Sequence, residues 1–389
     1  MAPYAKAILF MTSFNDLGLS APLLKAVAGL QYAEPTPIQA QAIPPGLLGR
    51  DVLGIAQTGS GKTAAFALPI LQRLTTAPHA TGGAPRALIL APTRELASQI
   101  AETFRALGRH VGIRVALVFG GMPKGRQART LANGVDVLVA TPGRLIDHMQ
   151  DRAVRLDQVE VLVLDEADHM LDLGFILPIR RIVRDVPAKR QTMFFSATMP
   201  KEIASLADAM LRDPVRVAVA PEATTVDTVE QHVIFVEQSH KRAVLSGLLR
   251  QHAGRTLVFT RTKHGADRVV KHLAEDGVDA TAIHGNKSQP QRERALAAFR
   301  SGTTRVLVAT DIAARGIDVV GVTHVINFEL PNVPESYVHR IGRTARAGAA
   351  GTAISLCDGS ERPFLRDIEK LIRARVAAMP APRPLARAA

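Results

Sequence analysis

Three carboxylates directly follow a short apolar run in the stretch VLVLDEADHML, residues 161–171. Asp165, Glu166 and Asp168 repel one another, and each loses hydration when it is buried. Such a cluster needs a compensating positive charge, and a bound metal ion is the first candidate. Beside that ion, Glu166 is suited to orient or deprotonate a water molecule. A solvated helix N-terminus, which also favours acidic residues, is the competing interpretation.

A glycine-containing loop supplies the second chemical pattern. Gly59-Ser60-Gly61-Lys62-Thr63 follows an apolar run and opens a helix-like segment. Glycines let backbone N–H groups turn toward an anion, and the helix N-terminus adds partial positive charge. Lys62 is then placed to reach nucleotide phosphates and Thr63 to bind Mg²⁺, which would also compensate Asp165. The alternative is a flexible turn. Ala56 departs from the generic pattern, which has glycine six residues before the lysine.

Short apolar segments alternate with helix-like segments along the whole chain, and they position these residues. Apolar strands that are separated by helices predict parallel sheets covered on both faces, here in two similar α/β domains in tandem. The expected strands are 51–56, 87–91, 135–140, 161–164 and 192–195 in the first half, and 256–259, 280–283, 305–309, 324–328 and 352–356 in the second.

The alternation breaks around residues 213–231, where prolines and weak helical periodicity suit a linker. We therefore expect a first domain over 12–216, a short linker over 217–230 and a second domain over 231–376. Residues 1–11 are expected to be a mobile extension, without the pattern of a signal peptide, and 377–389 a mobile proline-rich tail.

Composition restricts the partner and the compartment. The formal net charge of +13 and a pI of about 10.4 favour an acidic polymer over a membrane, since no apolar run reaches the ~18 residues of a span. Trp is absent and aromatic residues make up 4%, which argues against a base-stacking platform. The single cysteine, Cys357, excludes an internal disulfide, and the cytoplasm is the simplest compartment.

At this point the chain resembles the DEAD-box ATP-dependent RNA helicases, whose signature is spelled by residues 165–168. AQTGSGKT, residues 56–63, is that family's own form of the phosphate loop. Other motifs of the family follow in its order: PTPIQ (35–39), PTREL (92–96), Gly120-Gly121, TPGR (141–144), SAT (196–198), VFTRT (258–262), Gln291 with Arg294, ATDIAARGID (309–318) and HRIGRTARAG (339–348). Within the family the chain looks most like the bacterial RhlE type.

The resemblance implies two RecA-like domains, ATP and Mg²⁺ as cofactors, and a set of site residues. Catalysis falls to Lys62, Asp165, Glu166 and two arginine fingers, Arg343 and Arg346, with Thr63 and Asp165 at the metal. The nucleotide contacts are Phe14, Tyr32, Gln39, Thr58, Gly59, Ser60, Gly61, Lys62, Thr63 and Asp318. Gln39 has an amide that matches the adenine N6/N7 edge, and Tyr32 either stacks on the base or packs in the core.

The remaining motifs imply residues that bind RNA and couple it to ATP. The coupling residues are Asp168, Ser196, Thr198 and His339. The RNA contacts are Pro92, Thr93, Arg94, Gly120, Gly121, Thr141, Pro142, Gly143, Arg144, Arg261, Gln291, Arg294, Thr310 and Arg315. Two positions depart from the family's usual glycine: Gln31, which puts the local turn in doubt, and Ala345, which does so for the finger geometry.

The resemblance implies that ATP closes the two domains and completes an RNA groove, so that a short duplex is pried apart locally. Two alternatives stay open: an ATP-gated RNA clamp with little unwinding, and a DNA-dependent motor. The sequence does not identify the RNA, protein partners, the process served or the oligomeric state.

Overall fold

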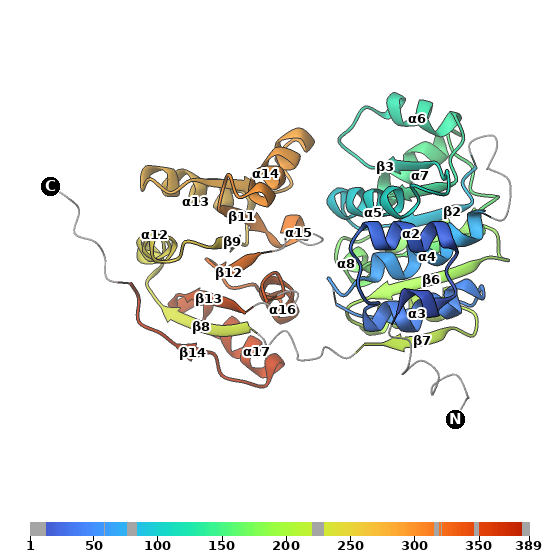
Figure 1. The fold of residues 1–389 in the computed structure, drawn as a ribbon. Helices are drawn as coiled ribbons and strands as arrows, with labels where there is room; N and C mark the ends of the chain where they lie inside the picture. The colour runs from blue at the N-terminus through green and yellow to red at the C-terminus, as the bar shows by residue number, and fades with distance from the viewer. Residues whose placement is uncertain are drawn as a thin grey trace. The chain divides into compact units, whose positions relative to one another are not determined.

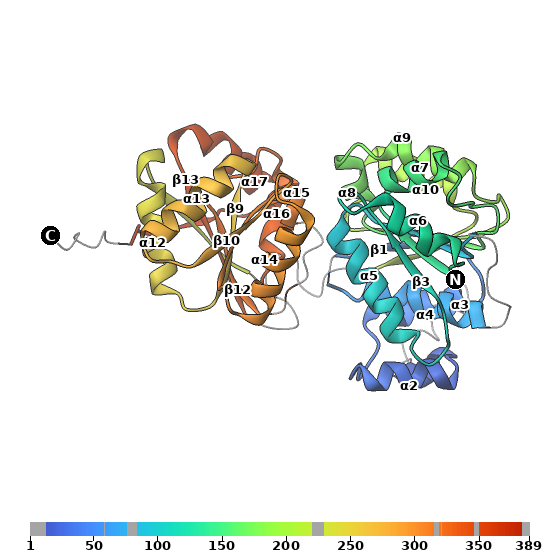
Figure 2. The ribbon, with the colours of Figure 1, turned by 90° about the horizontal axis from the view of Figure 1, so that it is seen from above.

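The chain forms two compact units, residues 1–220 and 221–389, in a computed structural model (Figure 1). The structure describes residues 13–57, 59–75, 84–219, 229–314, 319, 321–345 and 350–382. Each unit is a parallel sheet between helices, as the alternating sequence pattern predicts, and Figure 2 views the same elements from above.

The first unit contains a seven-stranded sheet in the order β3-β4-β2-β5-β6-β1-β7. Neighbouring strands are parallel, so all the carboxyl ends lie at one edge of the sheet. The strands are β1 (Val52–Ile55), β2 (Ala87–Leu90), β3 (Val115–Val118), β4 (Val137–Ala140), β5 (Val161–Leu164), β6 (Gln191–Ser196) and β7 (Val215–Ala218).

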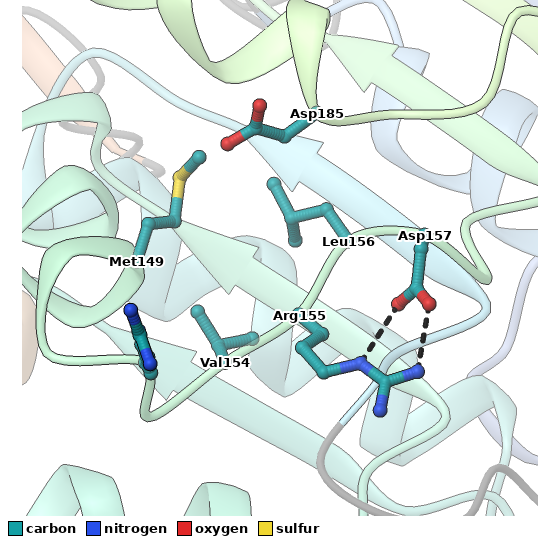
Figure 3. A pocket seen from close by; sticks show the side chains of 7 residues that line it. Met149, Val154, Arg155, Leu156, Asp157 and Asp185 are labelled. Carbon is teal, nitrogen blue, oxygen red and sulfur yellow. Dashed lines mark hydrogen bonds and ion pairs between the residues drawn. The ribbon is translucent and has the colours of Figure 1, made fainter.

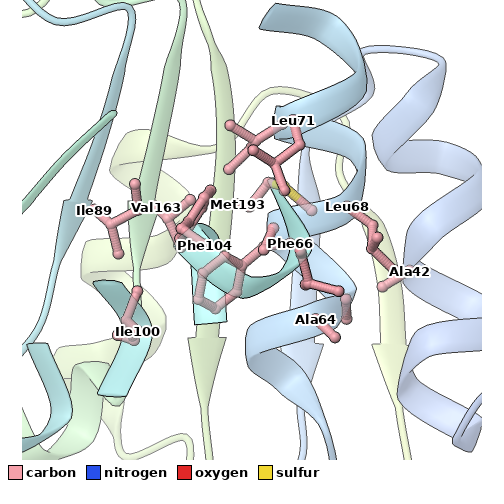
Figure 4. Close-up of a cluster of buried hydrophobic side chains, with 14 of the residues drawn as sticks. Ala42, Ala64, Phe66, Leu68, Leu71, Ile89, Ile100, Phe104, Val163 and Met193 are labelled. Carbon is pink, nitrogen blue, oxygen red and sulfur yellow. The ribbon is translucent and has the colours of Figure 1, made fainter. Parts of the chain in front are cut away.

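Helices bury both faces of this sheet, which explains why β2, β4 and β5 are apolar at every position. On one face Phe66 and Phe104 pack on Ile89 and Val163 (Figure 4); on the other face Leu162 lies in a separate apolar cluster. The helices are η2 (Phe14–Leu17), α2 (Ala21–Gly29), α3 (Pro37–Leu47), α4 (Lys62–Thr75), α5 (Arg94–Leu107), α6 (Lys124–Ala132), α7 (Pro142–Gln150), α8 (Ala167–Asp172), α9 (Ile176–Arg184) and α10 (Lys201–Met210).

The second unit repeats the topology. Its sheet runs β10-β11-β9-β12-β13-β8-β14, so both sheets order their own strands as third, fourth, second, fifth, sixth, first and seventh. The strands are β8 (Val229–Phe235), β9 (Arg255–Thr260), β10 (Ala280–Ile283), β11 (Val306–Thr310), β12 (Val322–Asn327), β13 (Gly351–Cys357) and β14 (Ala377–Ala378).

Apolar clusters on both faces of the second sheet hold its helices. Leu248 and Val269 pack on one face, while Phe299 and Tyr337 belong to clusters elsewhere in the unit. The helices are η3 (Gln238–His240), α12 (Lys241–Gln251), α13 (Lys263–Glu275), α14 (Gln289–Ser301), α15 (Asp311–Ala314), α16 (Pro334–Ile341), η4 (Gly359–Glu361) and α17 (Arg362–Ile372).

The linker and the tail predicted from the sequence include residues that belong to strands. Residues 217–218 belong to β7, which pairs with β1, and Val229 begins β8. Residues 377–378 form β14, which pairs with β8. β7 and β14 are edge strands with partly exposed side chains, so they lack the apolar run of a central strand and resemble irregular chain.

Candidate functional site

The strand order gathers the phosphate loop and the carboxylates at one place. β5, β6 and β1 are neighbours in the first sheet. The loop follows β1, the carboxylates follow β5, and Ser196 ends β6. The backbone N–H of Ala56 donates to the Ser196 carbonyl at 3.1 Å, which joins the start of the loop to β6. Open α/β sheets bind ligands at this edge.

The phosphate loop adopts a conformation that requires its glycines. Gly59 and Gly61 have φ of 89° and 90°, in the left-handed region. Lys62 begins α4, is 5% exposed and donates its Nζ to the Ala56 carbonyl at 2.6 Å. The lysine thus folds back across the loop, and Thr63 follows in the first turn. Thr58 lies outside the described residues.

Gln39 braces the phosphate loop. Its Nε2 donates to the Gly61 carbonyl at 3.1 Å, and its Oε1 accepts from the Thr36 N–H at 3.0 Å. The Thr36 hydroxyl donates to the Ser60 carbonyl at 2.8 Å. Both ends of the Gln39 amide are therefore engaged by backbone groups, and contact with an adenine would exchange or share one of these bonds.

Two aromatic rings lie near the start of the unit. Phe14 is buried, Tyr32 is 38% exposed, and their ring centroids are 6.3 Å apart. Partial burial raises the pKa of the Tyr32 hydroxyl. Tyr32 thus packs on Phe14 and keeps an exposed surface, which is compatible with both roles considered for it. Gln31 keeps the turn by adopting a φ of 59°.

The carboxylate after β5 is deeply buried. Asp165 is 2% exposed, and burial raises its pKa to about 7, with Lys62 opposing the rise and Glu166 adding to it. Ionising Asp165 is therefore unfavourable until further positive charge arrives. The Asp165 carboxylate and the Thr63 hydroxyl are oxygen donors of the kind that Mg²⁺ prefers, so these residues fit the expected ion. In the described part of the chain, no cluster of three His, Cys, Asp or Glu side chains suits a metal by itself.

The coupling residues of the first unit form one hydrogen-bonded cluster. Both the N–H and the hydroxyl of Thr198 donate to Asp168 Oδ2 at 2.9 Å. The Asp168 N–H donates to Ser196 Oγ at 3.2 Å, and this hydroxyl donates to the Thr198 carbonyl at 2.7 Å. The segment after β6 is therefore fastened to the first turn of α8, beside the phosphate loop.

The predicted RNA contacts of the first unit follow the other strands of the same edge, β3, β4 and β2. Thr93 caps α5 by accepting from the Leu96 N–H. The Arg94 guanidinium lies where a Cβ at Gly121 would be, and Gly121 also has a φ of 84°, which together favour glycine there. The segment after β4 contains Thr141, Pro142 and Gly143, and there is open space around Gly143.

Arg144, by contrast, is largely enclosed and holds the loop that follows β3. It donates to the Met122 carbonyl at 2.9 Å and to Gln127 Oε1 at 3.3 Å. Gln127 also donates to the Phe119 carbonyl and bonds His148 Nε2. Sequence reasoning missed Gln127 and His148. A polar pair on the buried faces of two neighbouring helices was the available signal.

Two arginines of the second unit, Arg340 and Arg343, are buried at the end of α16. Arg343 is buried, and its Nε donates to the His339 carbonyl at 3.2 Å. Arg340, which the sequence analysis passed over, donates to both oxygens of Asp311 at 2.5 and 2.8 Å. Ala345 has a φ of 54°. Arg315, Asp318 and Arg346 fall outside the described ranges.

The other predicted contacts of the second unit lie nearer solvent. Arg261 is partly exposed and donates to Asn332 at 3.1 Å. Gln291 caps α14 by accepting from the Ser288 N–H at 2.8 Å, and Arg294 is exposed on the same helix. Thr310 ends β11. Gln291 thus has a structural role even without RNA.

One hollow of about 390 Å³ lies apart from these residues (Figure 3). Met149, Val154 and Leu156 form its apolar part, and Arg155 makes two hydrogen bonds to Asp157 at 3.2 and 2.7 Å. None of the predicted site residues lines it.

Comparison with known proteins defines the class. Residues 36–206 match the DEAD/DEAH box helicase family, and residues 240–348 match the helicase conserved C-terminal domain. The DEAD-box ATP-dependent RNA helicase CshA of Bacillus cereus is 43% identical over 373 residues, 96% of this chain and 70% of the relative. S. cerevisiae Dbp5 bound to RNA and ADP BeF3 is 32% identical, with a TM-score of 0.83 over 95% of this chain and 96% of that one.

The chain belongs to the DEAD/DEAH box helicase family. The family, the two-domain α/β fold and the ATP-dependent RNA helicase class expected from the sequence are thereby confirmed. The RhlE type and the roles of individual residues remain predictions. Within the described residues, no helix has the length and apolar character to cross a bilayer.

Proposed function

We propose that this chain hydrolyses ATP at the carboxyl edge of its first sheet and uses the cycle to bind RNA and open short duplexes. The gathering of Lys62, Asp165 and the Asp168–Thr198 cluster on adjacent strands carries this proposal. A lysine beside a buried carboxylate, at the N-terminus of a helix, is the arrangement that phosphoryl transfer requires.

Each residue of the edge then has a task. The loop N–H groups and Lys62 bind the phosphates, and Gln39 contacts the adenine. Mg²⁺ held by Thr63 and Asp165 would neutralise the developing charge on the phosphates. Glu166 orients the attacking water and takes its proton.

RNA binds along the neighbouring β3-β4-β2 part of the edge through its sugar–phosphate backbone. Arg94 and the backbone at Gly121 and Gly143 are the contacts, with Arg144 holding the loop in place. Such binding is independent of sequence and weakens with salt. The net charge of +13 supports it.

The second unit completes the cycle in this proposal. ATP draws the two units together, Arg343 and Arg346 then face the γ-phosphoryl group, and Asp318 contacts the ribose. The Nε of Arg343 donates to the His339 carbonyl, and the N–H groups on its two Nη atoms are the donors proposed for the phosphate. Arg261, Gln291, Arg294, Thr310 and Arg315 extend the RNA surface, and product release reopens the clamp. We further propose that the protein is of the RhlE type and acts in the cytoplasm on RNA remodelling, ribosome biogenesis included.

Steady-state ATP hydrolysis tests the proposal, with no nucleic acid, with single-stranded RNA and with DNA of matched sequence, at fixed salt. We expect stimulation by RNA alone. Equal stimulation by DNA would favour the DNA-dependent motor. Absence of hydrolysis under every condition would contradict the proposal that the chain hydrolyses ATP. Displacement of a short RNA duplex then separates a helicase from an RNA clamp.

Glu166→Gln tests whether Glu166 is needed for hydrolysis but not for ATP-dependent RNA binding. We expect loss of turnover with ATP-dependent RNA binding retained, because the amide cannot take the proton of water yet leaves the phosphate loop intact. Ordinary turnover in this variant would remove Glu166 from the mechanism.

A further inference from the structure

His169 contacts the side chain of Glu166. The two residues lie three apart at the start of α8, and His169 Nδ1 is 3.3 Å from Glu166 Oε2. Both side chains are buried, with 3% of His169 and 6% of Glu166 exposed. A bond this far from solvent fixes a carboxylate better than an exposed one, because water does not compete for it.

The surroundings of the His169 ring indicate which nitrogen carries the proton. Its Nε2 is buried and has no hydrogen-bond partner among the described residues. A buried N–H or a buried charge without a partner costs more than a buried lone pair. With hydrogen on Nδ1, the buried Nε2 needs no acceptor, so Nδ1–H donates and Glu166 Oε2 accepts.

Glu166 lies at a turn of the backbone. Glu166 has a φ of 52°, in the left-handed region, at the turn between β5 and α8. Its N–H donates to Asp165 Oδ1 at 3.0 Å, and its side chain does not cap the helix. The contact with His169 restricts the direction of Oε2 in this carboxylate.

We infer that His169 is a positioning residue for Glu166, which it holds in the orientation needed to activate the attacking water. This inference rests on the proposed function, because it assigns a support to the residue given the role of general base. His169 does not contact the reacting atoms itself; it acts through the carboxylate.

Three substitutions separate positioning from packing. His169→Leu removes the donor. His169→Asn keeps an N–H donor near the former Nδ1, whereas His169→Gln carries its donor near the former Nε2. We expect RNA-stimulated kcat to fall about 10-fold in the Leu and Gln variants and to stay within about 3-fold in the Asn variant, while KM for ATP changes by less than about 2-fold.

Met170→Leu is the matched packing control, because Met170 is the next residue of α8 and is fully buried in the core. Its kcat should equal that of the wild type. Equal kcat values in all three His169 variants, or losses that follow only their unfolding temperatures, would overturn the inference.

A measurement without turnover keeps the inference testable if the wild type hydrolyses no ATP. Histidine-selective ¹⁵N labelling of the full chain reports the tautomer of His169, assigned by its loss in His169→Asn. We expect the Nδ1–H form and a shift of that resonance in Glu166→Gln. The Nε2–H form, or no response to Glu166→Gln, would contradict the contact whatever becomes of the proposed function.

Discussion

Two lysines occupy the same place in the two units and are used differently. Lys62 is the first residue of the helix after β1, and Lys241 is the first residue of the helix after β8. The two sheets have the same strand order. Both lysines are buried, so the difference between the units lies in what surrounds each ammonium group.

Lys62 has glycines before it and a carbonyl oxygen as its partner. The preceding loop contains two left-handed glycines, and its Nζ bonds the Ala56 carbonyl. A neutral acceptor leaves the ammonium charge uncompensated apart from the nearby Asp165. The site is thus prepared for an anion, which the loop N–H groups and the helix N-terminus also favour.

Lys241 is already compensated. Its Nζ bonds Glu361 and lies 3.1 Å from Asp358 Oδ2, and the connection before it, residues 236–240, contains no glycine. Although burial alone would raise the pKa of Asp358, hydrogen bonds from Ser360 and Lys241 lower it to about 2. The same fold therefore pairs the lysine with a neutral carbonyl in one unit and builds an internal ion cluster around it in the other.

The largest expected effect is on catalysis at Lys62. Lys62→Ala should lower kcat/KM for ATP more than about 100-fold, because the charge on the phosphates loses its nearest cation. Unfolding should change by about 1–3 kcal/mol, since the Ala56 carbonyl loses a charged donor. ATP hydrolysis and urea unfolding measure the two effects. Retention of turnover would show that Lys62 is not required for catalysis and would contradict the contrast drawn with Lys241.

Lys241→Met should chiefly lower the stability of the protein, in contrast to the catalytic effect expected at Lys62. The substitution removes the nearer of the two cations at the buried Glu361, since Arg261 lies 3.7 Å away, and should destabilise the protein by about 3–5 kcal/mol. Lys241→Met combined with Glu361→Leu removes the buried charge and should recover part of that loss. Urea unfolding of the single and double variants tests this. A Lys241→Met variant as stable as the wild type would contradict a structural role for the cluster.

His148 gives the first unit a dependence on pH. Burial lowers the pKa of His148, and Lys124 and Arg144 lower it further. The unfolded chain binds a proton at about pH 6.5, whereas the native ring resists it, so native stability is present above pH 6.5 and is lost as the pH falls below it. Between pH 7 and 5.5 we expect a loss of up to about 1 kcal/mol, which His148→Gln reduces in urea unfolding at each pH. The same slope in His148→Gln would assign the dependence to other groups.

The smallest effects concern two residues in left-handed backbone, one in each unit. Gln31 and Ala345 have φ of 59° and 54°. Gln31→Gly and Ala345→Gly should each stabilise the chain by about 0.5–1 kcal/mol, because glycine removes the strain of the side chain. Ala297→Gly, on the exposed side of α14, is the control and should destabilise by about as much. Thermal unfolding ranks the three.

Most of the central strands followed from the sequence, but β8, which lies between β13 and β14, was not among the expected strands. The expected strand 161–164 is found as Val161–Leu164, and 87–91 as Ala87–Leu90. Both are short apolar runs, and burial on two faces permits little else. β7 and β14 could not be found in this way, because an edge strand tolerates polar residues and its pairing depends on a distant strand.

The residues of the candidate site that lie close together in the sequence could be predicted from it. Glycines at 59 and 61, the lysine after them and the acids after β5 sit within short stretches whose conformation their own residues dictate. His169, Gln127 and Arg340 were missed, because a buried polar residue becomes meaningful only when its partner is known. Arg144, which was expected to contact RNA, holds a loop in this structure, and its contact with RNA stays a prediction.

The sequence by itself was enough to predict two α/β domains, a phosphate loop and the family, since each prediction depends on residues that lie close together along the chain. Only the tertiary structure decided which motifs are neighbours. Strand order puts β6 between β5 and β1 and so joins Asp168 to Thr198 across 30 residues of sequence. It also decided that Lys62 stays available for an anion while Lys241 does not, because the carboxylates that neutralise Lys241 lie more than 100 residues away along the chain.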